Sequence, residues 1–158
     1  MTSPPPGRTA FAAALALLTG RALTVGELAL RLRRKGYDAD TIAETSARLL
    51  DFGYLDDGRT AVAWAENAVQ VRGLGPRRLR EGLVRRRLPR ELVDETVAGL
   101  FATGEEAQFA VAVLGKWERA KGPAVDSAGR HSAYAHLRRR GFSGAAARAA
   151  LFNRPEIE

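Results

Sequence analysis

The stretch that decides the fold is Leu32-Arg33-Arg34-Lys35-Gly36-Tyr37, because the chain contains two further versions of it. A shift of 51 residues places it over Leu83-Val84-Arg85-Arg86-Arg87-Leu88, and a further 54 residues lead to Leu137-Arg138-Arg139-Arg140-Gly141-Phe142. The 51-residue shift also pairs Leu28 with Leu79. Self-similarity with a period near 50 residues indicates stacked structural modules.

The sequence around these repeats is helical in pattern. Ala, Leu, Arg and Glu dominate it, and no segment shows the apolar–polar alternation typical of strands. Thr24 with Glu27, and Thr103 with Glu106, have the spacing of capping boxes. Glycine and proline breaks predict nine helices, over residues 8–20, 25–35, 39–52, 57–72, 76–87, 89–101, 105–120, 127–140 and 143–152.

Nine helices divide into three sets of three, in agreement with the repeat. We therefore predict an all-α fold of three tandem three-helix modules, over residues 8–55, 56–103 and 104–158. Residues 1–7 contain three prolines, and we expect them to form a disordered leader. Modules stacked in line would make the molecule elongated.

Charge follows the repeat as well. The chain has a net charge of +7, with 22 Arg against 3 Lys. Residues 1–37, 71–90 and 119–158 carry +5, +7 and +5, and the two segments between them carry −5 each. Such basic clusters favour acidic partners, and Arg suits bidentate contact with phosphate or carboxylate. The candidate partner-binding residues are Arg33, Arg34, Lys35, Arg72, Arg77, Arg78, Arg80, Arg85, Arg86, Arg87, Arg138, Arg139 and Arg140.

The basic triplets have a second possible explanation. Basic residues at the C-terminal end of a helix stabilise it by complementing the helix dipole. Adjacent helical residues point about 100° apart, however, so three consecutive charges cannot all lie near the terminal carbonyls. Both explanations stay open at this point.

Little catalytic equipment is present. The sequence has no Cys, and its only histidines, His131 and His136, have a spacing that places them on different helix faces. No Gly-rich phosphate loop occurs, and Asp56 and Asp57 fit a helix N-cap better than a metal site. We therefore expect no enzymatic activity, no cofactor and no metal.

The aromatic residues fall at apolar helix positions and are expected in the core. Base stacking is conceivable only at two of them, Tyr37 and Phe142, which adjoin basic triplets. The whole aromatic set considered is Tyr37, Phe52, Tyr54, Trp64, Phe101, Phe109, Trp117, Tyr134 and Phe142.

The apolar stretch from Ala10 to Leu18 follows Arg8, as in a secretory signal, but we interpret it as a buried first helix. No apolar run approaches the roughly 18 residues that a membrane-spanning helix needs. Together with the lack of Cys, this predicts a cytoplasmic protein.

Three segments of this sequence resemble the RecX regulatory family. They are Gly53-Tyr54-Leu55-Asp56-Asp57 before an Ala- and Trp-containing helix, then Arg72-Gly73-Leu74-Gly75-Pro76, and finally Arg139-Arg140-Gly141-Phe142. The resemblance covers residues 10 to 152. The sequence departs from the family at Arg85-Arg86-Arg87-Leu88-Pro89, where a Lys-Gly-Ile-like turn is usual.

The resemblance implies three tandem three-helix modules in an elongated, curved array. It implies binding within the helical groove of a RecA filament on single-stranded DNA, with inhibition of ATP hydrolysis, strand exchange and filament growth. Modulation of recombination, DNA repair and the SOS response would follow. Weak direct DNA contact is also attributed to the family, and we expect this chain to act as a monomer.

The alternative is a helix-turn-helix-like DNA-binding protein whose recognition helix is 76–87, which carries Arg77, Arg78, Arg80 and Arg85. Residues that read bases by bidentate hydrogen bonds are scarce in this sequence, because Asn and Gln together occur four times. A small hydrolase is a third class, and it lacks any nucleophile–base constellation.

Overall fold

The computed structural model describes residues 9–102 and 104–152, and within them every regular element is an α-helix. The predicted disordered leader, residues 1–7, lies outside the described residues. Each helix begins and ends within two residues of its predicted bounds. The helices are α1 (Ala10–Gly20), α2 (Val25–Arg34), α3 (Ala39–Asp51), α4 (Asp57–Gln70), α5 (Pro76–Arg85), α6 (Arg90–Leu100), α7 (Glu105–Lys121), α8 (Ser127–Arg140) and α9 (Gly144–Phe152).

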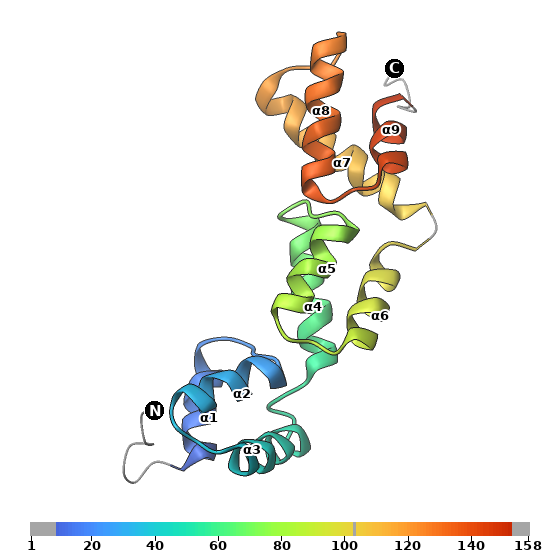
Figure 1. Ribbon diagram of the computed structural model, residues 1–158. Coiled ribbons are helices and arrows are strands. Elements are labelled where there is room, and N and C mark those ends of the chain that lie inside the picture. The colour runs from blue at the N-terminus through green and yellow to red at the C-terminus, as the bar shows by residue number, and fades with distance from the viewer. Residues whose placement is uncertain (1–8, 103, 153–158) are drawn as a thin grey trace.

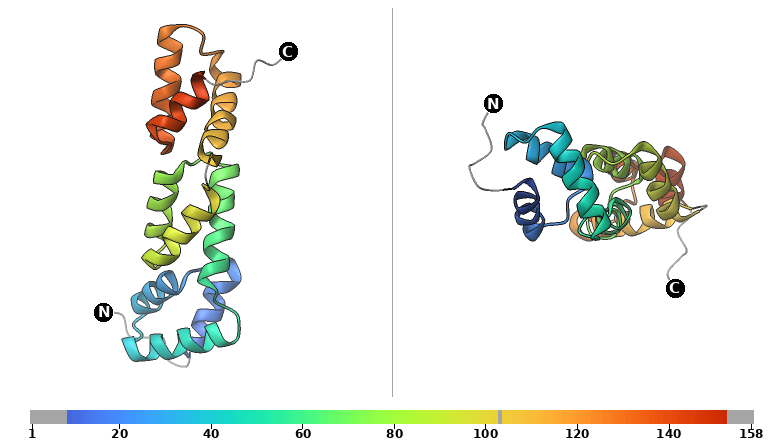
Figure 2. Two further views of the ribbon diagram at one scale, coloured as in Figure 1. Left: turned by 90° about the vertical axis from the view of Figure 1, so that its right-hand side faces the viewer. Right: turned by 90° about the horizontal axis from the view of Figure 1, so that it is seen from below.

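The helices form three bundles that lie one above the other in an elongated body (Figure 1). A view turned by 90° shows the same stacking, with α2, α5 and α8 in successive bundles (Figure 2). Each bundle has its own core, in which leucines from the second helix are fully enclosed: Leu28 and Leu32, Leu79 and Leu83, and Leu137. The apolar stretch that begins at Ala10 belongs to the first core.

Helix starts follow the sequence signals closely, with one exception. Thr24 and Glu27 form the predicted capping box at the start of α2. The capping box predicted for Thr103 with Glu106 includes a residue outside the described ones, and the N-cap of α7 is Gly104, in a left-handed conformation. The carboxylate of Glu106 instead accepts hydrogen bonds from the backbone and hydroxyl of Ser143, at 2.6 and 3.0 Å.

The two acidic residues at the start of α4 make hydrogen bonds in different modules. Asp56 is the N-cap and accepts the backbone N–H of Arg59 at 2.8 Å, as predicted. Asp57 reaches across to the first bundle, where its carboxylate accepts the N–H of Val25 at 2.8 Å. Among the described residues, no group of three or more potential metal ligands occurs.

The bundles join through the ends of their second helices. At one junction the N-cap of α5, Gly75, donates its N–H to the carbonyl of Arg140, the last residue of α8, at 2.8 Å. At the other, the N-cap of α2, Thr24, donates its hydroxyl to the carbonyl of Arg86, the C-cap of α5, at 2.6 Å. These contacts occupy equivalent positions of the repeat. They satisfy terminal groups that a helix leaves unpaired, and they place opposite ends of helix dipoles together.

Close backbone approach at these junctions requires glycine. A Cβ on Gly75 would lie 2.5 Å from the backbone nitrogen of Phe142 and 2.6 Å from the carbonyl carbon of Gly141. Arg87, which has the repeat position of Gly141, adopts φ 60°, in the left-handed region. There the glycine is on the opposite side of the junction: a Cβ on Gly26 would lie 2.6 Å from the Cβ of Arg87.

Two aromatic residues that were expected in the core are on the surface. Phe52 and Tyr54 are 63% and 58% exposed and pack edge to face with each other, and Phe52 packs in the same way with Phe11. Both follow the last turn of α3, where a helix-periodicity argument no longer fixes which way a side chain points.

No single helix in the described residues is both long and apolar enough to span a bilayer, although α6 and α7 taken as one bent pair meet the length and composition requirements.

The end-to-end arrangement predicts an extended particle in solution. A compact protein of this length would have a radius of gyration near 15 Å. We expect small-angle X-ray scattering to give a clearly larger value. A value at the compact estimate would mean that the modules fold back on one another.

Gly75→Ala tests the junction between the second and third bundles. Because the added methyl meets backbone atoms that cannot rotate away, we expect a loss of about 1–3 kcal/mol in the free energy of unfolding, measured by chemical denaturation. Gly99→Ala is the matched control, since a Cβ at Gly99 meets nothing within 4 Å. Gly99 lies in the last turn of α6, so that change should stabilise by less than about 1 kcal/mol. Equal effects of the two changes would contradict a tight junction.

Candidate anion-binding groove

Two of the three basic triplets lie at module junctions. Arg85 to Arg87 end α5 where it meets the first bundle, and Arg138 to Arg140 end α8 where it meets the second. Arg33 to Lys35 end α2 and are exposed, and within residues 9–102 and 104–152 no other bundle meets that end of α2. Of the three triplets, the second and third therefore lie at junctions between described bundles and the first does not.

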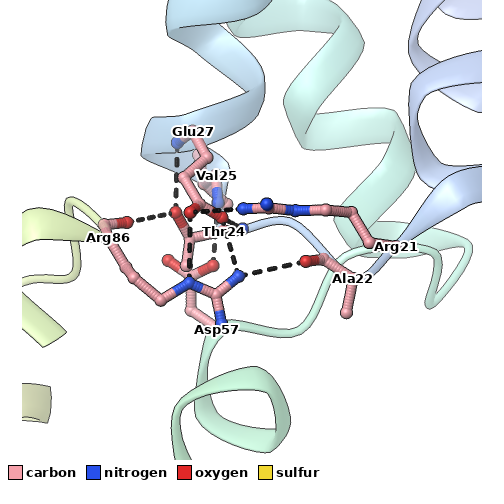
Figure 3. A network of polar contacts seen from close by, with 7 residues as sticks. All are labelled: Arg21, Ala22, Thr24, Val25, Glu27, Asp57 and Arg86. Carbon is pink, nitrogen blue, oxygen red and sulfur yellow. Dashed lines mark hydrogen bonds and ion pairs between the residues drawn. The ribbon is translucent and has the colours of Figure 1, made fainter. Parts of the chain in front are cut away.

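Arg86 holds the first junction together, and Figure 3 shows its guanidinium turned toward the first bundle. Its Nε and Nη2 groups donate to the two carboxylate oxygens of Glu27, at 3.1 and 2.8 Å. Nη2 also donates to the carbonyl of Ala22 at 3.0 Å. The side chains of Arg86 and Glu27 are only 13% and 14% exposed. All these hydrogen-bond acceptors belong to the first bundle. The role of Arg86 is therefore to stabilise the junction between the first and second bundles.

The same contacts set the acidity of Glu27. Burial alone would raise the pKa of Glu27. Hydrogen bonds from Arg86 and from the backbone N–H of Thr24, with the positive charges of Arg86 and Arg21, outweigh burial and hold this pKa below its usual 4.5. The carboxylate is therefore stabilised in its charged form, as an ion-paired group should be.

Six arginines converge on one surface hollow beside α5, which we call the arginine groove. Its volume is about 480 Å³, and among the described residues no Asp or Glu lines it. The groove runs between the ends of α4 and α8 and along the side of α5. Its lining consists of Trp64, Arg72, Leu74, Arg78, Gly82, Arg85, Arg86, Arg139 and Arg140.

The arginines of the groove differ in how far their charge is neutralised. Glu81 pairs with Arg78 at 3.0 Å and more loosely with Arg85 at 3.6 Å. Arg72, Arg139 and Arg140 have no ion pair with any carboxylate in residues 9–102 and 104–152. Three uncompensated guanidinium groups in one hollow make a site that favours an anion.

Neighbouring groups hold two of these arginines in place. Arg140 donates from Nη1 to the carbonyl of Arg72 at 2.7 Å. The guanidinium carbon of Arg72 lies 5.7 Å from the centroid of the Trp64 ring, within the range of a cation–π contact. Gly82 makes room for that ring, since a Cβ there would lie 2.1 Å from the ring atom Cη2 of Trp64.

A second basic hollow adjoins the arginine groove and shares Arg72 and Arg140 with it. Its volume is about 260 Å³, and Lys116, Lys121, Trp117 and His136 also line it. Burial lowers the pKa of His136, and the charges of Arg140 and Arg139 lower it further. His136 is thus biased toward its neutral form by the excess of positive charge around it.

The aromatic residues beside these basic side chains are not the ones expected. Tyr37 and Phe142, the two considered for base stacking, are 9% and 1% exposed and belong to the cores. Trp64 and Trp117 are half-buried and line the two hollows. Both were expected in the core, and both are partly buried and pack against a core.

The other predicted arginines of α5 contact carboxylates of the second bundle and backbone carbonyls at the end of α8. Arg80 pairs with Asp94, and Arg77 pairs with Glu81 while donating to the carbonyl of Arg138 at 3.1 Å. Arg78 donates similarly to the carbonyl of Arg139.

The N-terminal end of α5 is thus covered by the third bundle. A recognition helix reads bases with residues near that end. This arrangement counts against the helix-turn-helix alternative built on residues 76–87.

Fold and groove together define a helical repeat protein with a basic hollow where two of its modules meet. Family models support a more specific assignment: residues 10–49 match the first three-helix domain of RecX, and residues 56–97 match the second. The chain belongs to the RecX family of regulatory proteins.

Individual relatives agree with the family match. The chain is 36% identical over 137 residues to "Regulatory protein RecX" of Deinococcus radiodurans, covering 85% of this chain and 62% of that protein. It is 33% identical to "Regulatory protein RecX" of Mycobacterium sp. strain KMS, covering 75% of that protein. A crystal structure of RecX from Lactobacillus salivarius has the same fold, with a TM-score of 0.79 at 18% identity, covering 91% and 93% of the two chains.

Arg86→Gln tests the role of Arg86 at the first junction. Removing the guanidinium leaves the Glu27 carboxylate, which is only 14% exposed, without its main partner. We therefore expect a loss of about 2 kcal/mol in unfolding free energy by chemical denaturation at pH 7. Arg85→Gln is the matched control. It removes a neighbouring charge that is 71% exposed, and it should cost less than about 0.5 kcal/mol.

A second measurement on Arg86→Gln separates the ion pair from general damage. Because the folded pKa of Glu27 is lowered, its contribution to stability is present above pH 4.5 and lost as pH falls through the folded pKa. In Arg86→Gln this part of the acid-induced loss should shrink. If the two proteins lose stability in parallel below pH 4.5, the proposed pairing does not operate in solution.

Proposed function

We propose that this protein binds the RecA filament on single-stranded DNA and inhibits its ATP hydrolysis, strand exchange and growth. It would act as a monomeric regulator of recombination and DNA repair in the cytoplasm, without catalytic activity of its own. Membership of a family of regulatory proteins named RecX supports this role. The observation that carries it is the arginine groove, whose uncompensated charge favours an anionic partner.

The junctions explain how such a surface suits a filament. Because the groove lies where the second and third bundles meet, its arginines come from helices that only the assembled array brings together. The exposed triplet Arg33 to Lys35 ends α2 in the first bundle, at the end of that helix opposite to the junction with the second bundle. A long body with separated basic contacts can engage several positions of a repeating partner, and weak contacts then add through effective concentration.

Paired substitutions in the groove test this proposal. The double variant Arg72→Gln, Arg139→Gln removes two uncompensated charges without touching the Arg86 ion pair. Each exposed contact contributes up to about 1 kcal/mol, so the concentration needed for half-inhibition of RecA ATP hydrolysis on single-stranded DNA should rise about tenfold.

The matched control is Arg59→Gln with Arg90→Gln, which removes the same charge from side chains that are 76% and 90% exposed and do not line the groove. It should inhibit like the parent. Circular dichroism must first show that each variant is folded. Equal inhibition by the groove variant and the parent would place the contact surface elsewhere, and the triplet Arg33 to Lys35 would be the next surface to neutralise.

A further inference from the structure

We propose that the arginine groove binds a nucleotide, with its base against Trp64 and its phosphates on Arg72, Arg139 and Arg140. The inference rests on the proposed function, because it takes the same groove as a binding surface and names the chemistry that the groove accepts. The nucleotide can be free or part of a single strand, and the two sources share this chemistry.

The charge of the groove favours phosphate over a carboxylate side chain. Three guanidinium groups without a carboxylate partner meet in one hollow that no acidic residue lines. One carboxylate brings a single negative charge, whereas the phosphates of a nucleotide bring one or more at closely spaced oxygens. The planar fork of Arg matches two oxygens of a phosphate with two parallel hydrogen bonds.

The cationic side chains are partly ordered before any ligand arrives. Arg140 is bonded to the carbonyl of Arg72. Arg72 lies over the Trp64 ring, and a base that stacks on that ring displaces the guanidinium toward the phosphates. Arg78 fixes the carbonyl of Arg139 at 3.1 Å, which positions the backbone from which the Arg139 side chain extends. Side chains that are already held lose less conformational entropy when they bind.

Trp64 adds a feature that a plain phosphate site does not need. Its indole is half-buried and forms a wall of the groove at one side of the arginines. Aromatic rings interleaved with arginines are typical of surfaces that bind unpaired bases, since every base has a face that can stack. The volume of about 480 Å³ is in the range of small-molecule sites, so one nucleotide can fit.

The adjoining hollow offers a way to distinguish a free nucleotide from a nucleotide within a single strand. It shares Arg72 and Arg140 with the arginine groove and has its own indole, Trp117, with Lys116 and Lys121. A strand that enters the arginine groove can continue past the shared arginines and place a second nucleotide near Trp117. A free nucleotide would affect Trp64 alone.

The experiment uses the full chain without RecA, so its result is independent of filament inhibition. The protein is labelled with 5-fluorotryptophan, and its two tryptophans give two ¹⁹F NMR signals, assigned with Trp117→Phe. The probes are inorganic triphosphate, thymidine triphosphate and a short oligothymidylate. We expect a nucleotide probe to shift the Trp64 signal, and inorganic triphosphate to compete with it more weakly.

Arg72→Gln with Arg139→Gln should weaken nucleotide binding about tenfold, and Arg59→Gln with Arg90→Gln should not. If both nucleotide probes shift the Trp64 signal equally and leave the Trp117 signal unchanged, the ligand of the groove is a free nucleotide. If oligothymidylate binds more tightly and also shifts the Trp117 signal, the ligand is a single strand. The proposal is overturned if neither nucleotide probe shifts Trp64, if inorganic triphosphate binds as tightly as thymidine triphosphate, or if the groove variant binds like the parent. Intact nucleotide binding with no filament inhibition would overturn the proposed function alone.

Discussion

The structure depends on how helix ends are satisfied. The last carbonyls of a helix have no partner within it, and burying them unpaired is costly. In this chain the starts of α2 and α5 supply donors to the ends of α5 and α8, through Thr24 and Gly75. The first and second bundles therefore each supply a hydrogen-bond donor to the C-terminal end of the second helix in the next bundle. This exchange fixes the spacing of the modules and brings together the arginines that line the groove.

The two triplets at the junctions, Arg85 to Arg87 and Arg138 to Arg140, serve this arrangement in two ways. Their backbone carbonyls accept the hydrogen bonds that join the modules, and their side chains either close the junction or border the groove. Arg86 has the first task, because Glu27 is within reach. Arg139 is left without a carboxylate and has the second. The helix-end explanation of the triplets therefore applies to their backbone carbonyls and to Arg86. The binding explanation applies to side chains such as that of Arg139.

The helices were predictable from the sequence because their signals are local. The capping pair Thr24 and Glu27, the glycine breaks and the apolar periodicity each act within a few residues, and the repeat indicated three modules. The junctions were not predictable, since whether Arg86 faces solvent or Glu27 depends on contacts between residues 59 positions apart. The choice of Tyr37 and Phe142 over Trp64 failed for a similar reason: adjacency to a basic triplet in sequence does not decide which side of a ring is enclosed.

The junctions have one more property, which is their direction. At both of them the N-terminal end of one second helix meets the C-terminal end of the next, so the body has a distinct front and back and no twofold symmetry. A body without twofold symmetry is not equivalent to itself when turned end over end. On a polymer that has its own polarity, the two ways of seating it differ in free energy, and the favoured one would align every bound copy in the same sense along the track.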